Sequence, residues 1–120
     1  MRKLNVFYTV FFWLIIFSCS DKYQTKQSLV SMLKSKDQDS IINALKIIQR
    51  NKDTSMLLFL LEDADDPRVN HRSDFKGMSI YQIKMVTIKS LTGIVPDKEI
   101  TYKPDSAIIK FYLSKLKKHD

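Results

Sequence analysis

The chain has 120 residues and a formal charge of +7, with two glycines, three prolines and one cysteine. A single cysteine excludes an intramolecular disulfide, and two separate glycines leave no glycine-rich phosphate-binding loop. The few glycines and prolines are separated by long stretches rich in Leu, Ile, Lys and Ser, a composition that predicts an all-α domain.

The first 18 residues have the pattern of an export signal. Arg2 and Lys3 form a positively charged start, and the 14 residues that follow, 4–17, are apolar except at two positions. This run is shorter than the roughly 20 apolar residues that a membrane-spanning helix needs. We therefore interpret residues 1–18 as a signal peptide that is removed on export.

The only cysteine, Cys19, stands directly after this segment. The sequence Ile16-Phe17-Ser18-Cys19 resembles the lipobox of bacterial lipoproteins, with a small residue before the cleaved bond and the cysteine as first mature residue. The resemblance implies a thioether-linked diacylglycerol and an N-acyl group, such as palmitate, on Cys19, and two or more acyl chains hold a protein stably on a bilayer. It places the protein in the bacterial cell envelope, at the outer membrane or on the periplasmic side. A plain signal peptide that leaves the cysteine unmodified is the alternative.

After a polar tether at residues 19–27, one helical domain is expected at residues 28–118. Apolar residues at helical spacing predict helices at 28–35 and 41–50, with Asp39 or Ser40 as cap of the second. Residues 56–61 are apolar throughout and contain no β-branched residue. They predict a central helix, capped by Asp53 or Thr54 and buried nearly all round.

The clearest helix boundaries enclose residues 80–92. Ser79 and Gln82 have the spacing of a capping box, and Met78 and Ile83 fit a hydrophobic staple. Gly93 then supplies the residue that most easily takes a left-handed conformation at a helix end.

A last helix is predicted to open at Pro104-Asp105. Its apolar stripe consists of Ile108, Phe111, Tyr112 and Leu116, and lysines fill much of the remaining surface. The lysines allow three interpretations: a nucleic-acid surface, contact with anionic headgroups, or a solvated helix face. Export and the spread of the charges argue against nucleic acid, and the solvated face is the simplest interpretation.

An internal similarity appears at an offset of 28 residues. The sequence 33–37 matches 61–65, and each is followed by a helix. This pattern, with Asp65-Asp66-Pro67-Arg68-Val69 as a turn, resembles a pair of HEAT-like repeats over residues 28–93. The resemblance implies a short helical-hairpin solenoid of about five helices, whose units bury their apolar faces against one another. A small orthogonal helical bundle is the alternative.

Few residues offer metal or cofactor chemistry. Asp63, Asp65 and Asp74 have the spacing of positions 1, 3 and 12 of a calcium loop. However, Arg68 stands where the loop needs glycine, and position 12 lacks the longer glutamate. Turn solvation and helix capping explain these carboxylates better. The two histidines are far apart in sequence, so we expect neither a metal nor a cofactor.

The segment 67–78 is the best candidate for a binding site. It is a basic and aromatic insertion between two predicted helices, and long loops on rigid scaffolds are often functional. Its candidate partner-binding residues are Arg68, His71, Arg72, Phe75 and Lys76. A loop whose Val69 and Phe75 simply pack onto the core is an equally good interpretation.

Two classes of function follow from these observations. The first is a lipid-anchored helical adaptor of the cell envelope, not itself an enzyme, that binds an unidentified protein partner as HEAT-like domains commonly do. The second is a small envelope hydrolase, or an accessory to one, that uses Asp65, Asp66 and His71 as acid and base. We rank the adaptor first, because no assembled catalytic motif accompanies those three residues.

Overall fold

A computed structural model of the chain describes residues 26–118. The predicted signal peptide, Cys19 and residues 20–25 of the predicted tether lie outside the described residues. The chain divides into two compact units, Met1–Ser31 and Met32–Asp120. The described part of the first unit, residues 26–31, is helical and buries Leu29. The predicted helix start at residue 28 is therefore too late, because Lys26 and Gln27, both good helix formers, are already helical.

The second unit is built from helices, so the all-α prediction is confirmed. Its helices are α2 (Gln38–Asn51), α3 (Leu57–Leu61), α4 (Ile80–Thr92) and α5 (Ser106–Lys117), with short 3₁₀ turns at Thr54–Met56 and Ser73–Phe75. The extended pairing found within residues 26–118 is an isolated antiparallel bridge between Val69 and Ser79. Over the same residues, no helix is both long and apolar enough to cross a bilayer.

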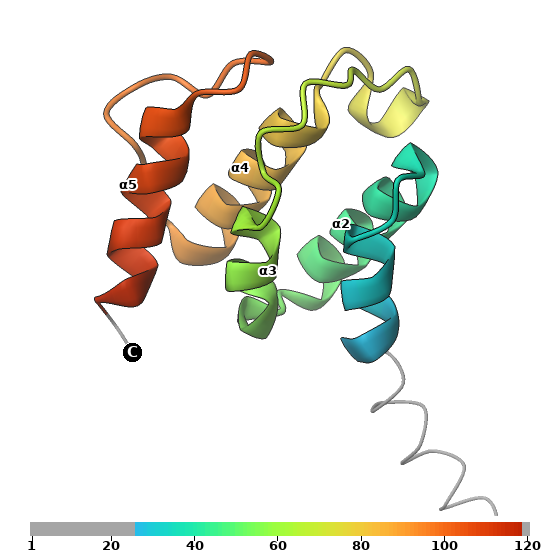
Figure 1. Ribbon diagram of the computed structural model, residues 1–120, viewed down its shortest axis with the longest axis horizontal. Coiled ribbons are helices and arrows are strands. Elements are labelled where there is room, and N and C mark those ends of the chain that lie inside the picture. The colour runs from blue at the N-terminus through green and yellow to red at the C-terminus, as the bar shows by residue number, and fades with distance from the viewer. Residues whose placement is uncertain (1–25, 119–120) are drawn as a thin grey trace, which may run out of the picture. The chain divides into compact units, whose positions relative to one another are not determined.

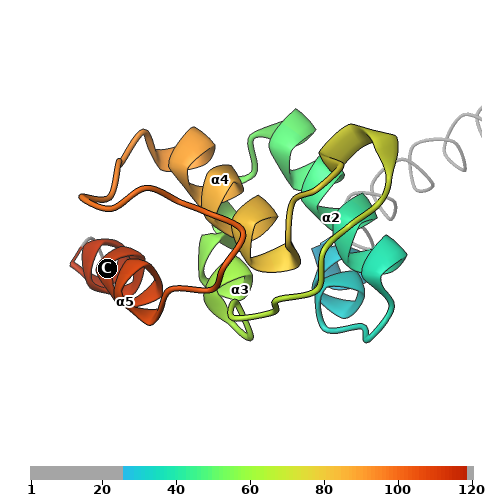
Figure 2. The same ribbon diagram turned by 90° about the horizontal axis from the view of Figure 1, so that it is seen from above.

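The four helices of the second unit lie in two layers (Figure 1). Figure 2 shows α2 and α4 in one layer and α3 and α5 in the other, and contacts join α2 to α4, α3 to α5 and α3 to α4. The chain therefore changes layer from each helix to the next. Stacked helical hairpins have this alternation, and the HEAT-like repeat itself stays a prediction.

The core of the second unit lies mainly between α2 and α4. The residues that α2 buries are Ile41, Ile42, Ala44, Leu45 and Ile48. The apolar residues that α4 buries are Ile80, Tyr81, Ile83, Met85 and Ile88. Complete burial of one such aliphatic side chain contributes about 1.5–3 kcal/mol. These two faces therefore fix how α2 and α4 pack, and with them the segments at their ends.

The predicted ends of α4 are confirmed. The Ser79 hydroxyl accepts a hydrogen bond from the Gln82 N–H at 3.1 Å. At the other end Gly93 has φ +70°, and its N–H donates to the Lys89 carbonyl oxygen at 2.8 Å. The left-handed region is open to glycine at little cost, so the helix ends where the sequence predicts.

The start of α2 differs from the prediction. The helix begins at Gln38 with Asp37 in the capping position, so the prediction of Asp39 or Ser40 as cap is wrong. The Ser35 hydroxyl accepts from the Asp37 N–H at 3.1 Å, and Asp37 in turn accepts from the Ser40 hydroxyl at 3.0 Å. This tight turn before Gln38 starts the helix earlier than the apolar pattern suggests.

The segment 56–61 is helical, but it is not buried nearly all round. Met56, Leu60 and Leu61 are buried, whereas the Leu58 residue keeps 45% of its surface exposed. Leu57 and Phe59 are half-buried, so the exposed side of this segment is the one that carries Leu58. Asp53 caps the preceding 3₁₀ turn as predicted, accepting from the Ser55 N–H at 3.1 Å.

The last helix also follows its predicted start. Asp105 caps α5 by accepting from the Ala107 N–H at 2.9 Å. Of the predicted stripe, Ile108 and Tyr112 are buried, while Phe111 and Leu116 are half-buried. The Tyr112 hydroxyl donates to the Ile94 carbonyl oxygen at 2.8 Å, which ties α5 to the end of α4.

Candidate functional site

The segment 67–78 is closed at its base by backbone hydrogen bonds. The Asn70 N–H donates to the Met78 carbonyl oxygen at 2.9 Å, and the Gly77 N–H donates to the Asn70 carbonyl oxygen at 3.0 Å. The Ile80 N–H donates to the Arg68 carbonyl oxygen at 2.9 Å, which joins the base of the loop to the start of α4. The insertion is therefore an ordered loop rather than an irregular connection.

The Asn70 side chain is buried inside this loop and bonds to its backbone. Asn70 is 3% exposed, and its Oδ1 accepts from the Arg72 N–H at 2.9 Å. Its buried Nδ2 has no hydrogen-bond partner among the described residues. The side chain thus forms an Asx turn that sets the direction of the chain at Arg72.

Three side-chain contacts attach the loop to α2. The Arg72 guanidinium donates to Asn43 Oδ1 at 3.2 Å and lies 3.5 Å from the Asp39 carboxylate. The Lys46 ammonium and the Asp74 carboxylate form an ion pair. Because the base of the loop is bonded to α4, these contacts fix the loop across two helices.

The five predicted partner-binding residues have different surroundings. The side chains of Arg68 and Arg72 bond to other parts of the same chain, and Phe75 is half-buried. His71 and Lys76 are exposed. The structure therefore leaves His71 and Lys76 as the predicted residues that are most accessible to a partner.

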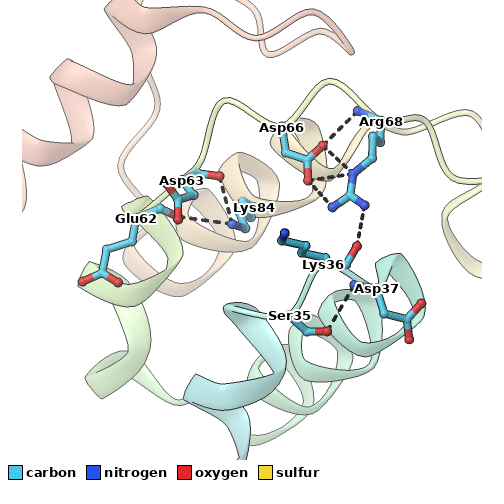
Figure 3. A network of polar contacts seen from close by, with 8 residues as sticks. All are labelled: Ser35, Lys36, Asp37, Glu62, Asp63, Asp66, Arg68 and Lys84. Carbon is cyan, nitrogen blue, oxygen red and sulfur yellow. Dashed lines mark hydrogen bonds and ion pairs between the residues drawn. The ribbon is translucent and has the colours of Figure 1, made fainter.

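Arg68 connects the loop to the turn before α2 (Figure 3). Its guanidinium donates to both carboxylate oxygens of Asp66, at 2.7 Å from Nη2 to Oδ2 and 3.0 Å from Nε to Oδ1. The Arg68 Nη1 also donates to the Lys36 carbonyl oxygen at 2.6 Å. A fork of this kind fixes the guanidinium plane, so Arg68 holds the turn at Lys36 in a defined place.

This arrangement sets the charge of Asp66. Burial alone would raise the pKa of its carboxyl, but the hydrogen bonds and positive charge of Arg68 outweigh burial and lower the pKa below the usual 3.8. Asp66 is therefore a fixed carboxylate near neutral pH, a poor proton donor. The Tyr81 N–H donates to the Asp66 carbonyl oxygen at 2.9 Å, which also anchors its backbone.

Lys84 is a buried cation in the middle of α4. The residue is 2% exposed, and its Nζ donates to the carbonyl oxygens of Glu62 and Asp63, each at 3.3 Å (Figure 3). These carbonyls belong to the two residues that follow α3. Burial lowers the pKa of Lys84 below 10.5, although Asp66, Asp63 and Asp65 oppose the shift. Among the described residues, no carboxylate forms an ion pair with Lys84.

A pocket of about 430 Å³ lies beside Lys84 and the Asp66–Arg68 pair. Leu33 and Ile41 supply its apolar lining. Its charged lining consists of four cations and two carboxylates: Lys34, Lys36, Arg68, Lys84, Asp63 and Asp66. Its volume falls within the roughly 300–1,000 Å³ of small-ligand sites.

The sequence analysis missed Lys84 as a site residue. It shares a helix face with Ile80 and Ile88, four residues away on either side, and both of these are buried. A lysine in the middle of an apolar stripe was the available signal, because lysine is almost never fully buried without a partner. The groups that accept hydrogen bonds from its ammonium are set by where α3 ends, and the sequence does not predict that position.

The proposed acid and base residues differ in their surroundings. Asp66 is bonded to Arg68, whereas Asp65 and His71 are exposed. Within residues 26–118, no group of three or more His, Cys, Asp or Glu side chains is placed to hold a metal ion. Comparison of the chain with protein-family models, curated proteins and solved structures finds no significant match.

Proposed function

We propose that this protein is a lipid-anchored adaptor of the bacterial cell envelope that binds another protein through its 67–78 loop. The anchor part of the proposal rests on the lipobox-like sequence that ends at Cys19 and on the export signal before it. The partner is a protein rather than a nucleic acid, because export removes the chain from the compartment of nucleic acids.

The observation that carries the binding role is the attachment of the loop to two helices. Backbone hydrogen bonds join its base to α4, and side-chain contacts join Arg72 and Asp74 to α2. His71 and Lys76 remain exposed on this fixed loop. A loop ordered before binding loses less conformational entropy when a partner docks, which favours recognition.

The hydrolase alternative requires Asp65, Asp66 and His71 to transfer protons. It needs Asp66 to donate or accept a proton, but this carboxylate is bonded to Arg68 and its pKa is lowered. A general acid or base works best when its pKa lies near the working pH. No observation on the described residues favours this alternative over the adaptor.

The anchor is tested by expressing wild type and Cys19→Ser in a bacterial host and comparing intact mass and membrane fractionation. We expect wild type to begin at Cys19 with added acyl mass and to sediment with membranes, and the variant to lose both properties. A wild-type protein that is soluble and unacylated would contradict the anchor.

The binding role is tested by placing a photo-crosslinking amino acid at position 71 or 76 in living cells. The matched control carries it at Lys110, which is exposed on α5. We expect a defined crosslinked protein from positions 71 and 76 and none from position 110. Equal crosslinking from all three positions would contradict a loop-specific partner.

A further inference from the structure

The second candidate for recognition is the pocket beside Lys84. It is lined by the turn before α2, by Ile41 of α2, by the segment after α3 and by Lys84 of α4. These elements are fixed by the Arg68 bonds to Asp66 and to the Lys36 carbonyl, so the pocket is preorganised. The exposed candidate residues of the 67–78 loop, His71 and Lys76, are not among the residues that line it.

The charges around the pocket are not balanced. The Asp66 carboxylate is paired with Arg68 at 2.7 Å, and Lys34 lies 3.9 Å from the exposed carboxylate of Glu62. Lys36 and Lys84 have no ion-pair partner among the described residues. Figure 3 shows the Lys36 side chain extending toward the space between Lys84 and Asp66. The pocket therefore offers two cations to an incoming anion.

The surroundings of Lys84 favour the binding of an anion in this pocket. The residue is 2% exposed, and its ammonium donates to two carbonyl oxygens, each at the long distance of 3.3 Å. A buried charge without an ion-pair contact is costly even with the carboxylates of Asp63, Asp65 and Asp66 nearby, and an anion that reaches it recovers part of that cost. The lowered pKa of Lys84 agrees with this incomplete compensation.

From this geometry we infer that the pocket binds a carboxylate on an aliphatic stem, such as a glutamate side chain of an acidic peptide segment, between Lys36 and Lys84. Leu33 and Ile41 supply the apolar contact for the stem. Asp63 and Asp66 also line the pocket and repel a dianionic phosphate more than a singly charged carboxylate.

The test uses the wild-type full chain, purified in an uncharged maltoside detergent from whichever cell fraction contains it, and titrated by ¹⁵N NMR. The probe is the peptide Glu-Leu-Glu-Leu with both ends blocked, so that its carboxylates come only from side chains. The matched probe is blocked Gln-Leu-Gln-Leu, and inorganic phosphate is the third arm.

We expect the glutamate peptide to shift the amide signals of Lys36, Arg68 and Lys84, and its Kd to be about tenfold below that of the glutamine peptide. Lys36→Gln, an exposed position that leaves the fold intact, should raise the Kd for the glutamate peptide about tenfold as well. Lys84→Met should do the same, and Lys110→Gln on α5 should leave the Kd unchanged.

Three results would overturn the inference. The first is no binding of the glutamate peptide, or equal binding of the glutamine peptide. The second is an equal loss of affinity in Lys110→Gln and Lys36→Gln, which would indicate unspecific charge attraction. The third is binding of phosphate, with the same dependence on Lys36, in place of the peptide. The inference does not depend on acylation of Cys19 or on crosslinking from positions 71 and 76, so it stands or falls separately from the proposed function.

Discussion

The Ser79 hydroxyl donates a 2.6 Å hydrogen bond to the Tyr102 carbonyl oxygen while it accepts from the Gln82 N–H. The sequence predicts the second of these bonds but not the first. One fully buried hydroxyl therefore starts α4 and also holds the connection that leads to α5.

Ser79→Ala removes both bonds at once. We expect the free energy of unfolding to fall by about 2 kcal/mol, because the lost cap and the lost hydrogen bond to the Tyr102 carbonyl each cost about 1 kcal/mol. Urea unfolding at neutral pH measures the difference. Ser90→Ala, at an exposed position on the same helix, is the control and should change little. Equal stability of the two variants would contradict a structural role for the Ser79 hydroxyl.

Asp66→Asn tests the ion pair at the base of the loop. Arg68 lowers the pKa of Asp66 despite burial, so the pair stabilises the fold above pH 3.8, and this contribution is lost as pH falls through the lowered pKa. We expect the variant to lose about 1.5–3 kcal/mol at pH 7, the usual range for hydrogen bonds to charged groups. It should also lose less stability than wild type between pH 4 and pH 2. Asp65→Asn, at an exposed neighbouring carboxylate, should follow the wild-type acid profile in thermal melts.

Lys84→Met replaces the buried ammonium by an apolar group of similar length. Burial lowers the pKa of Lys84 in the folded state below 10.5. As pH rises toward 10.5, the folded chain therefore loses the Lys84 proton before the unfolded chain does, and deprotonation favours the folded state. Wild type should therefore gain stability relative to Lys84→Met between neutral pH and pH 10.5. Chemical unfolding of both proteins across this window measures the difference. A constant difference would show that Lys84 titrates normally.

Tyr112→Phe removes the hydroxyl that bonds to the Ile94 carbonyl oxygen at 2.8 Å. We expect a loss of about 1 kcal/mol at pH 7. Burial raises the pKa of Tyr112 to about 12, so its contribution is complete below the ordinary value of 10.0 and is lost as pH rises through about 12. Wild type and variant should approach each other in stability over that window. Tyr102→Phe, at an exposed tyrosine, should show neither effect.

The parts of the fold that the sequence predicts are those set by local chemistry. Ser79 and Gly93 define the ends of α4 because capping and left-handed glycine act within a few residues. The start of α2 is predicted wrongly because the Ser35 hydroxyl bonds the Asp37 backbone and moves the turn. The exposure of Leu58 is missed because periodicity does not say how many neighbours a short helix has.

The candidate site was less predictable than the fold. The unusual composition of the 67–78 loop marks it in the sequence, and the structure shows an ordered loop there, while its role in binding stays a prediction. Arg68 bonds to Asp66 only two residues away, but its bond to the Lys36 carbonyl is a contact across 32 residues, which no local pattern contains. The partners of Lys84 depend in the same way on the place where α3 ends.

The bond from Arg68 to the Lys36 carbonyl also has a mechanical consequence. The predicted tether precedes Lys36 in the sequence, and α2 follows Lys36. Tension along the tether would therefore reach Lys36 before it reaches α2. Arg68 holds this point from the base of the 67–78 loop, at the edge of the charged pocket. If the proposed lipid anchor exists, a force along the tether would therefore reach the bond that shapes both candidate recognition surfaces before it reaches α2.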